Sequence, residues 1–141
     1  MTNVVVDAST ALAWCFPDES SDYADGVLIA LEGRTILVPA LWNLEIANAI
    51  LVGERNNRLR QPEIRQFAAL LEGLSLVQDK QSVGEHLSNV LPLARKYGLS
   101  AYDAAYLELS IRRCAPLATL DGKLLGAARR AGVELFSGEA A

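Results

Sequence analysis

Four acidic residues far apart in the chain have side chains that could act together: Asp7, Glu45, Asp103 and Asp121. The set contains no histidine or cysteine, and oxygen-only ligand sets favour hard cations such as Mg²⁺ or Mn²⁺ over zinc. Carboxylates packed together without a cation repel one another and take up protons, so such a cluster favours a divalent ion. An ion held in this way can activate water and stabilise charge on a phosphoryl group, which is the chemistry of phosphodiester hydrolysis.

Three of these acids also have an ordinary structural explanation. Asp7 can cap the helix that follows it, and Asp121 with Gly122 forms a common turn pair. Asp103 follows Ser100 with the spacing of a helix start, where a serine caps and an acid meets the free N–H groups. Taken one at a time, these residues do not identify a catalytic site. The prediction depends on whether the fold brings them together.

Glu45 is harder to explain as a structural residue. It lies in PALWNLEIANAIL, which is apolar almost all round and which we expect to form a largely buried helix. No basic residue stands three or four positions from Glu45, so its charge has no partner on the same helix. A buried carboxylate without a partner is costly, and a metal, a cation from elsewhere or a proton must meet its charge. Asn48, one helical turn further on, is a weaker candidate to support the site.

Short β-rich apolar runs alternate with longer helical patterns along the chain. The runs predict strands at 3–7, 35–39, 74–78, 116–120 and 133–136. The patterns between them predict helices at roughly 9–16, 20–32, 40–56, 62–73, 82–97, 100–113 and 122–131. This alternation predicts a mainly parallel sheet covered on both faces. We therefore expect one domain over residues 1–141, an α/β, Rossmann-like three-layer sandwich with a central sheet of about five strands. Sites in such sheets form beyond the carboxyl ends of the strands, where Asp7 and Asp121 stand.

The composition is that of a globular protein. The chain has 141 residues, of which 51% are hydrophobic, enough for a core without disulfides or structural metals. No apolar run approaches the roughly 20 residues that span a bilayer, and the N-terminus lacks the pattern of a secretion signal. We therefore expect a cytoplasmic protein with no membrane segment. Cys15 and Cys114 form no zinc motif and are expected to be small buried hydrophobes, while the single histidine, His86, is expected on a helix surface.

Charge is unevenly distributed along the chain. The net charge of −4 argues against bulk electrostatic binding to nucleic acid. Residues 1–33 carry six acids and no lysine or arginine. The stretch GERNNRLRQPEIR, in contrast, contains the four arginines Arg55, Arg58, Arg60 and Arg65. An ordinary solvated surface is one explanation for these arginines, and a role in guiding a substrate is the other.

Four segments carry a family resemblance: VVDASTALAWCF, VPALWNLEIANAIL, LSAYDAAYLELSIRR and PLATLDGKLLGAARRAGVEL. They resemble the PIN-domain family, and specifically its VapC-type bacterial toxins, and the likeness extends in order over essentially the whole chain. The resemblance implies a Rossmann-like sandwich and a Mg²⁺- or Mn²⁺-dependent ribonuclease. It also implies an RNA substrate, a homodimer, and a cognate VapB-type antitoxin that holds the enzyme inactive.

The resemblance also assigns roles to residues. The family's catalytic and metal-binding acids fall on Asp7, Glu45, Asp103 and Asp121. Ser9 and Thr119 fall where the family places hydroxyls that support the acids, although local hydrogen bonding explains them equally well. Gly122 stands where the family often has a larger, frequently basic residue, which leaves Lys123 as the nearest cation for a substrate phosphate. The four arginines between 55 and 65 become candidates for guiding RNA toward the acidic site.

The resulting hypothesis is hydrolysis by water. Asp7, Glu45 and Asp103 would bind one metal directly or through water, and Asp121 would complete the site or help to hold a second ion. Because the nucleophile is water rather than the ribose 2′-OH, the products are expected to carry 5′-phosphate and 3′-OH ends.

Two other functions are compatible with the sequence. An aspartyl-phosphate receiver or phosphatase also uses acids at the ends of parallel strands, but it needs a phosphoacceptor after its third strand and a lysine after its fifth. Asp79 follows the third predicted strand, and Ser137, not a lysine, follows the fifth. The other alternative is a catalytically silent PIN-like binding module, against which the presence of all four acids argues.

Overall fold

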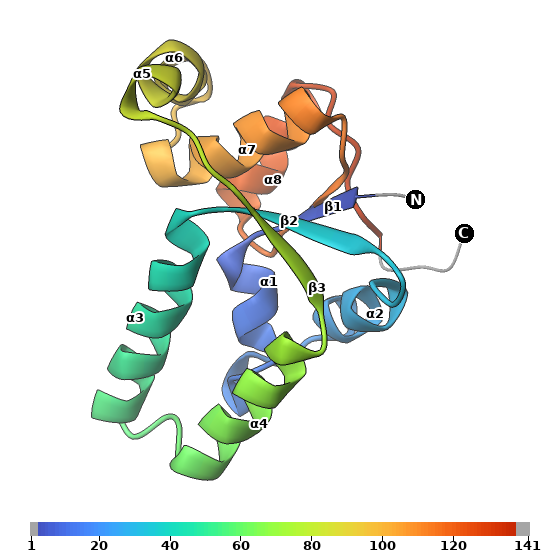
Figure 1. Ribbon diagram of the computed structural model, residues 1–141, viewed down its shortest axis with the longest axis vertical. Coiled ribbons are helices and arrows are strands. Elements are labelled where there is room, and N and C mark those ends of the chain that lie inside the picture. The colour runs from blue at the N-terminus through green and yellow to red at the C-terminus, as the bar shows by residue number, and fades with distance from the viewer. Residues whose placement is uncertain (1–2, 138–141) are drawn as a thin grey trace.

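Four parallel strands form the central sheet over residues 3–137, the part of the chain that this computed structural model describes. In spatial order they are β3 (Ser75–Asp79), β2 (Thr35–Pro39), β1 (Asn3–Val6) and β4 (Leu117–Ala118). Figure 1 labels the first three of these strands. The central strands β1 and β2 are apolar runs whose side chains at 4–6 and 36–38 are almost completely buried. Such runs are typical of a parallel sheet with both faces covered, so the predicted α/β sandwich is confirmed.

The predicted fifth strand at 133–136 is reduced to a single bridge. Leu135 pairs in parallel with Leu117. The Leu117 N–H donates to the Glu134 carbonyl and the Phe136 N–H donates to the Leu117 carbonyl, each at 2.9 Å. Because β4 is only two residues long, it offers the incoming segment one position rather than a ladder. The expectation of about five strands is therefore corrected, within the described residues, to four strands and a bridge.

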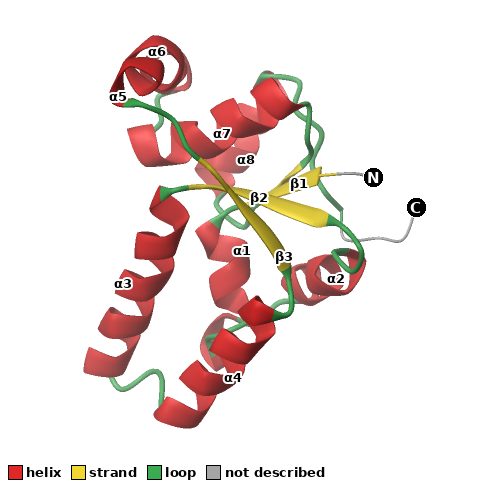
Figure 2. Ribbon diagram, viewed as in Figure 1, coloured by secondary structure: helices red, strands yellow, loops and turns green. Residues whose placement is uncertain are grey.

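Helices cover both faces of this sheet (Figure 2). One side carries α1 (Ala8–Ala13), α2 (Asp22–Ala30), α3 (Leu41–Arg55) and α4 (Gln61–Glu72), with a 3-10 turn, η1 (Pro17–Glu19), between the first two. The other side carries α5 (Val83–Glu85), α6 (Leu91–Tyr97), α7 (Ala101–Arg113) and α8 (Gly122–Arg130). α1, α3 and α8 follow directly on β1, β2 and β4, so their first turns lie at the carboxyl edge of the sheet.

The helix predicted over 82–97 is interrupted. A π-helical turn, η2 (His86–Val90), separates α5 from α6. Pro92 explains the break, because it has no N–H to donate to the carbonyl four residues earlier and the α-helical ladder cannot continue through it. His86 is exposed in this turn, as the sequence predicted.

α3 is less buried than its sequence suggested. Within this helix Trp42, Ile46 and Gly53 are buried, whereas Leu44 is 75% exposed and Leu51 is 43% exposed. The expectation of a largely buried helix is wrong, because one stripe of α3 packs on α1 and β2 while its other apolar side chains face outward. An exposed apolar helix face of this kind is typical of an interaction surface.

The two cysteines differ in their exposure to solvent. Cys15 is buried, as expected, but Cys114 is exposed, so the expectation for Cys114 is wrong. Cys114 ends α7 in a left-handed conformation (φ 50°) at the surface turn that leads to β4. Among residues 3–137 we find no helix with the length and apolar character needed to cross a bilayer.

Candidate active site

A cavity of about 400 Å³ opens at the carboxyl edge of the sheet. It is lined by the four acids Asp7, Glu45, Asp103 and Asp121. The predicted supporting residues Ser9 and Asn48 also line it. The four come from different elements, namely the end of β1, the second turn of α3, the first turn of α7 and the start of α8. The parallel topology therefore gathers carboxylates that lie up to 114 positions apart in the sequence.

The structural roles of these acids are present as well. Asp7 caps α1 by accepting the Thr10 N–H at 3.2 Å, and Asp121 caps α8 by accepting the Lys123 N–H at 3.3 Å. Ser100 caps α7, where its hydroxyl accepts the Asp103 N–H at 3.1 Å. Capping and site geometry are thus compatible, because the turn that orders each helix also directs its carboxylate toward the cavity.

Two hydroxyls fix the Asp7 carboxylate. Ser9 Oγ donates to Asp7 Oδ1 and Thr119 Oγ1 donates to Asp7 Oδ2, each at 2.6 Å. Each hydroxyl in turn accepts a backbone N–H at 3.0 Å, from Leu120 and Asp121 respectively. Since each hydroxyl both accepts and donates, its orientation is determined. The network ties the end of β1 to the loop after β4 and leaves Asp7 only 4% exposed.

Glu45 is held by a residue that the sequence analysis missed. The Tyr106 hydroxyl donates to Glu45 Oε1. Tyr106 is 1% exposed and lines the cavity. It stands three residues after Asp103, on the same face of α7. This three-residue spacing from Asp103 was the only sequence signal for Tyr106. It was too weak to single the residue out, because many other residues of an apolar helix stand at similar spacings.

The pKa values of Asp7, Glu45 and Asp103 are all raised, and burial is the largest cause for each. The hydroxyl hydrogen bonds oppose the rise in Asp7, and the Tyr106 hydroxyl opposes it in Glu45. For Asp103, the charge of Asp121 and a hydrogen bond between these two carboxyl groups raise the pKa further. These groups therefore lie close enough to disfavour one another's ionisation.

The donor set fits a hard divalent cation. It supplies only oxygen ligands, and mutual repulsion among the carboxylates would be relieved by positive charge. Within residues 3–137 no group of three or more acid, histidine or cysteine side chains is arranged so that it could hold a metal ion. Mg²⁺ does not need such a group, because it keeps several waters and commonly binds through one or two carboxylates together with substrate phosphates.

The predicted cations lie at two distances from the cavity. Lys123 is exposed at the start of α8, two residues after Asp121. The arginines between 55 and 65 lie at the far end of α3 and beyond it, and Arg55 is about 15 Å along the helix axis from Glu45. The structure does not bring them to the cavity. Moreover, Arg58 pairs with Asp18 and Glu19, and Arg60 lies 3.7 Å from a carboxylate oxygen of Glu63.

Known proteins resemble this chain in sequence and in fold. The family model described as PIN domain matches residues 4–130. The chain belongs to the PIN-domain family. It is 34% identical over 122 residues to Ribonuclease VapC3 from Pyrobaculum aerophilum, a match that covers 86% of this chain and 91% of that protein. This PIN-domain protein is thus a homologue of a VapC ribonuclease, as its sequence segments predicted.

Two solved structures share the fold. The crystal structure of PAE2754 from Pyrobaculum aerophilum matches with a TM-score of 0.67 and 26% identity over 89% of this chain and 79% of that chain. The crystal structure of FitAcB from Neisseria gonorrhoeae matches with a TM-score of 0.62 and 17% identity over 96% of this chain and 97% of that chain. At that identity, the second likeness shows the fold alone.

Proposed function

We propose that this PIN-domain protein is a Mg²⁺- or Mn²⁺-dependent endoribonuclease, and the toxin of a toxin-antitoxin pair that acts in the cytoplasm. The observation that carries the proposal is the convergence of four carboxylates on one cavity at the carboxyl edge of the sheet. Homology to a VapC ribonuclease supports RNA as the substrate class.

Asp7, Glu45 and Asp103 would hold one divalent ion, directly or through water, and Asp121 would complete the site or help to hold a second. When bound, such an ion lowers the pKa of water and stabilises charge on the phosphoryl oxygens. The chain itself supplies orientation. Ser9 and Thr119 fix the carboxylate of Asp7. The positive ends of the α7 and α8 dipoles face the cavity and favour an anionic substrate there.

The direct test is RNA cleavage by the purified chain after removal of any co-purifying partner. We expect cleavage with Mg²⁺ or Mn²⁺, none with EDTA, and products with 5′-phosphate and 3′-OH ends. Cleavage that persists in EDTA, or products with 2′,3′-cyclic phosphates, would contradict the proposal. Calorimetry with Mn²⁺ should show that Asp103→Asn loses metal affinity while it keeps the wild-type circular dichroism spectrum.

The two alternative functions are separated by the same assays. In a receiver, Asp79 would accept a phosphoryl group. Here both of its carboxylate oxygens accept hydrogen bonds from Arg112, Oδ1 from Nη1 at 3.2 Å and Oδ2 from Nη2 at 2.5 Å. Arg112 is also bonded to the buried Glu108, and Asp79 does not line the acid cavity. A silent binding module would bind Mn²⁺ or a partner but leave RNA intact under all conditions tested.

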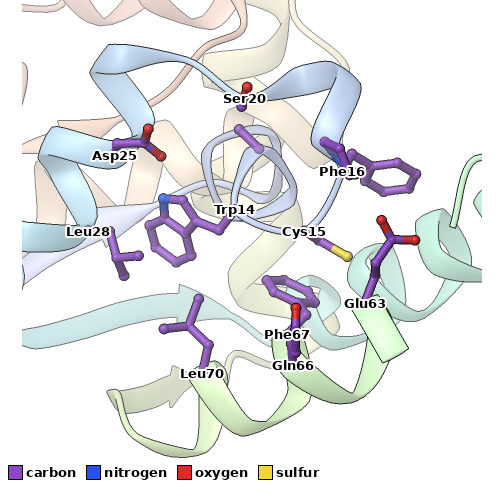
Figure 3. A pocket seen from close by; sticks show the side chains of 12 residues that line it. Trp14, Cys15, Phe16, Ser20, Asp25, Leu28, Glu63, Gln66, Phe67 and Leu70 are labelled. Atoms are coloured by element: carbon purple, nitrogen blue, oxygen red, sulfur yellow. The ribbon is translucent and has the colours of Figure 1, made fainter. Parts of the chain in front are cut away.

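For the antitoxin we propose a groove between α1, α2 and α4 as the docking site (Figure 3). This cavity of about 350 Å³ has apolar walls and carries two carboxylates. Its apolar lining includes Trp14, Leu28, Phe67 and Leu70, and its acids are Asp25 and Glu63. Apolar walls with acids fit an amphipathic segment that combines apolar anchors with a basic residue.

This docking site can be tested with neighbouring residues of α2. Leu28 lines the groove, whereas Ile29 is 76% exposed and does not. We expect Leu28→Asp to stop co-purification with the product of a small adjacent gene while RNA cleavage is kept, and Ile29→Asp to change neither. Equal effects of the two substitutions would contradict the assignment.

A homodimer would use a different apolar surface, next to the acid cavity. A cavity of about 300 Å³ between α3, η2 and α7 is lined mainly by apolar side chains, including Leu41, Leu87 and Tyr102. Leu87 is 60% exposed, Tyr102 65% and the neighbouring Leu44 75%. A second copy would cover these residues with its own equivalent surface. Sedimentation should show a dimer that Leu87→Asp converts to a monomer, and a wild-type chain that is always monomeric would contradict this.

A further inference from the structure

The exposed cations on α6 and α8 differ in their ion pairing from those at the end of α3. Within residues 3–137, ion pairs to carboxylates involve Arg58, Arg60 and Arg112. None of these pairs includes the cations of α6 and α8, and Arg130 at the end of α8 donates to the carbonyl of Tyr97 at the end of α6. A lysine or arginine without a carboxylate partner keeps its full charge available for a phosphate.

α8 carries three of these cations, Lys123, Arg129 and Arg130, and two of them lie on one face that leads away from the acid cavity. The helix begins at the cavity, where Asp121 caps it. Lys123, Gly126 and Arg130 are spaced by three and four residues, so they share one face, and the two cations are about 10 Å apart along the axis. Both cations are exposed. A Cβ added at Gly126 would meet no atom within 4 Å, so the surface between them is open.

Tyr97 holds the far end of this face. The guanidinium of Arg130 lies 5.7 Å from the Tyr97 ring centroid, and its Nη2 donates to the Tyr97 carbonyl at 3.5 Å. Lys96 Nζ lies 5.4 Å from the same ring. Contacts of this kind restrain long side chains that would otherwise move freely in solvent. Two cations from different helices are therefore gathered at one point, three residues before the Ser100 cap of α7.

We infer that Lys123, Arg130 and Lys96 form a track for the phosphates of single-stranded RNA, which leads along α8 into the acid cavity. Tyr97 acts as a positioning residue that holds two of the three cations. The inference rests on the proposed ribonuclease function and names the path of its substrate. Such a track is needed because the chain is acidic overall and the cavity gathers four carboxylates, which repel an RNA backbone. It replaces the arginines between 55 and 65 as the surface that guides RNA.

The test compares two pairs of cations in the full chain. Binding of a single-stranded RNA oligonucleotide is measured in Mg²⁺ at several KCl concentrations, in an Asp7→Asn background that does not cut. Lys96→Ala with Arg130→Ala should weaken binding about tenfold and reduce the slope of log affinity against log salt by roughly 0.7 for each lost phosphate contact. The matched control, Arg55→Ala with Arg65→Ala, should leave the affinity and the slope unchanged.

A third variant separates binding from folding. Gly126→Glu places a carboxylate on the open face without a steric clash. Because glutamate is a better helix former than glycine, this variant should melt at or above the wild-type temperature while it binds RNA more weakly.

The outcomes distinguish two kinds of failure. If the wild-type chain cleaves RNA but the track variants bind like their parent, or if only the Arg55/Arg65 control weakens binding, the track is wrong. If the wild-type chain neither binds nor cleaves RNA, the proposed function itself fails.

Discussion

Asp7 and Glu45 face the same cavity but are held in different ways. Asp7 is almost fully buried and accepts three hydrogen bonds, from Ser9, Thr119 and the Thr10 backbone. Glu45 lies on a helix that is exposed on one side, and the Tyr106 hydroxyl holds one of its oxygens. The site therefore has a rigid half, built on β1 and β4, and a more adjustable half on α3.

This difference also indicates how each carboxylate can be used. Oδ1 of Asp7 already accepts two hydrogen bonds and Oδ2 accepts one, so the free lone pair of this residue is on Oδ2. Glu45 keeps its Oε2 free of the Tyr106 contact. We therefore expect changes at Asp7 and its partners to have larger effects than changes around Glu45.

The largest effect should come from Asp7→Asn. This change removes the charge of the most constrained carboxylate but keeps its shape and an oxygen acceptor. Mutation of a residue that hydrogen-bonds to a metal ligand commonly lowers metal affinity or activity about 10- to 100-fold. Loss of the charged ligand itself should therefore reduce RNA cleavage by more than about 100-fold. Initial rates in Mn²⁺ would measure the loss, and a melting curve would show that the variant is folded. Full activity in a folded variant would remove Asp7 from the site.

Thr119→Val should have the next largest effect. It leaves Asp7 Oδ2 and the Asp121 N–H without their hydroxyl partner, which should cost about 1–3 kcal/mol of stability and about 10- to 100-fold in Mn²⁺ affinity. Calorimetry measures the affinity. Ser110→Ala is the matched control, because Ser110 is 2% exposed and its hydroxyl has no hydrogen-bond partner among the described residues. A similar loss of affinity in the control would show that buried hydroxyls act here through general stability alone.

Tyr106→Phe should have a smaller effect on metal binding, about tenfold, because Glu45 is partly exposed and water can replace the lost hydroxyl. Mn²⁺ affinity should fall, with a smaller change in melting temperature than for Thr119→Val. Tyr102→Phe, one turn away and 65% exposed, is the control. If Tyr106→Phe reduced affinity more than Thr119→Val, the ranking of a rigid half and an adjustable half would be reversed.

The smallest expected effect is a change in the stability of the metal-free chain with pH. Burial raises the pKa values of Asp7, Glu45 and Asp103 above their ordinary values. At pH values between the ordinary and the raised pKa, the folded state therefore binds more protons than the unfolded state. These groups therefore stabilise the fold below their ordinary pKa values, and the stability is lost as the pH rises through the raised values.

In EDTA the melting temperature should accordingly rise by a few degrees between about pH 7.5 and pH 5, at on the order of 3 °C for each kcal/mol. Added Mg²⁺ should remove most of this dependence by compensating the carboxylate charges, and Asp103→Asn should reduce it. A melting temperature that falls steadily over the same range in EDTA would contradict the raised pKa values.

Several features of the fold and site could be read from the sequence for local reasons. Fully apolar runs such as 4–6 and 36–38 require burial on both faces, which leads to a parallel sheet. The serine and acid spacing at Ser100 fixes a helix start, because a free N–H must find an acceptor within a few residues. The same reasoning could not foresee the π turn before Pro92 or the reduction of the last strand to a bridge, which depend on how neighbouring segments compete for hydrogen bonds.

The sequence by itself thus determined the α/β class, the helix starts and the four acids that a parallel topology would gather, because spacing along the chain carries that information. Only the tertiary structure decided that Tyr106 reaches Glu45, that Thr119 reaches Asp7 across 112 positions, and that one side of α3 is exposed. It also decided which cations stand beside the cavity. The physical reason is that contacts between elements depend on the angles and distances at which helices and strands pack, and no local periodicity records them.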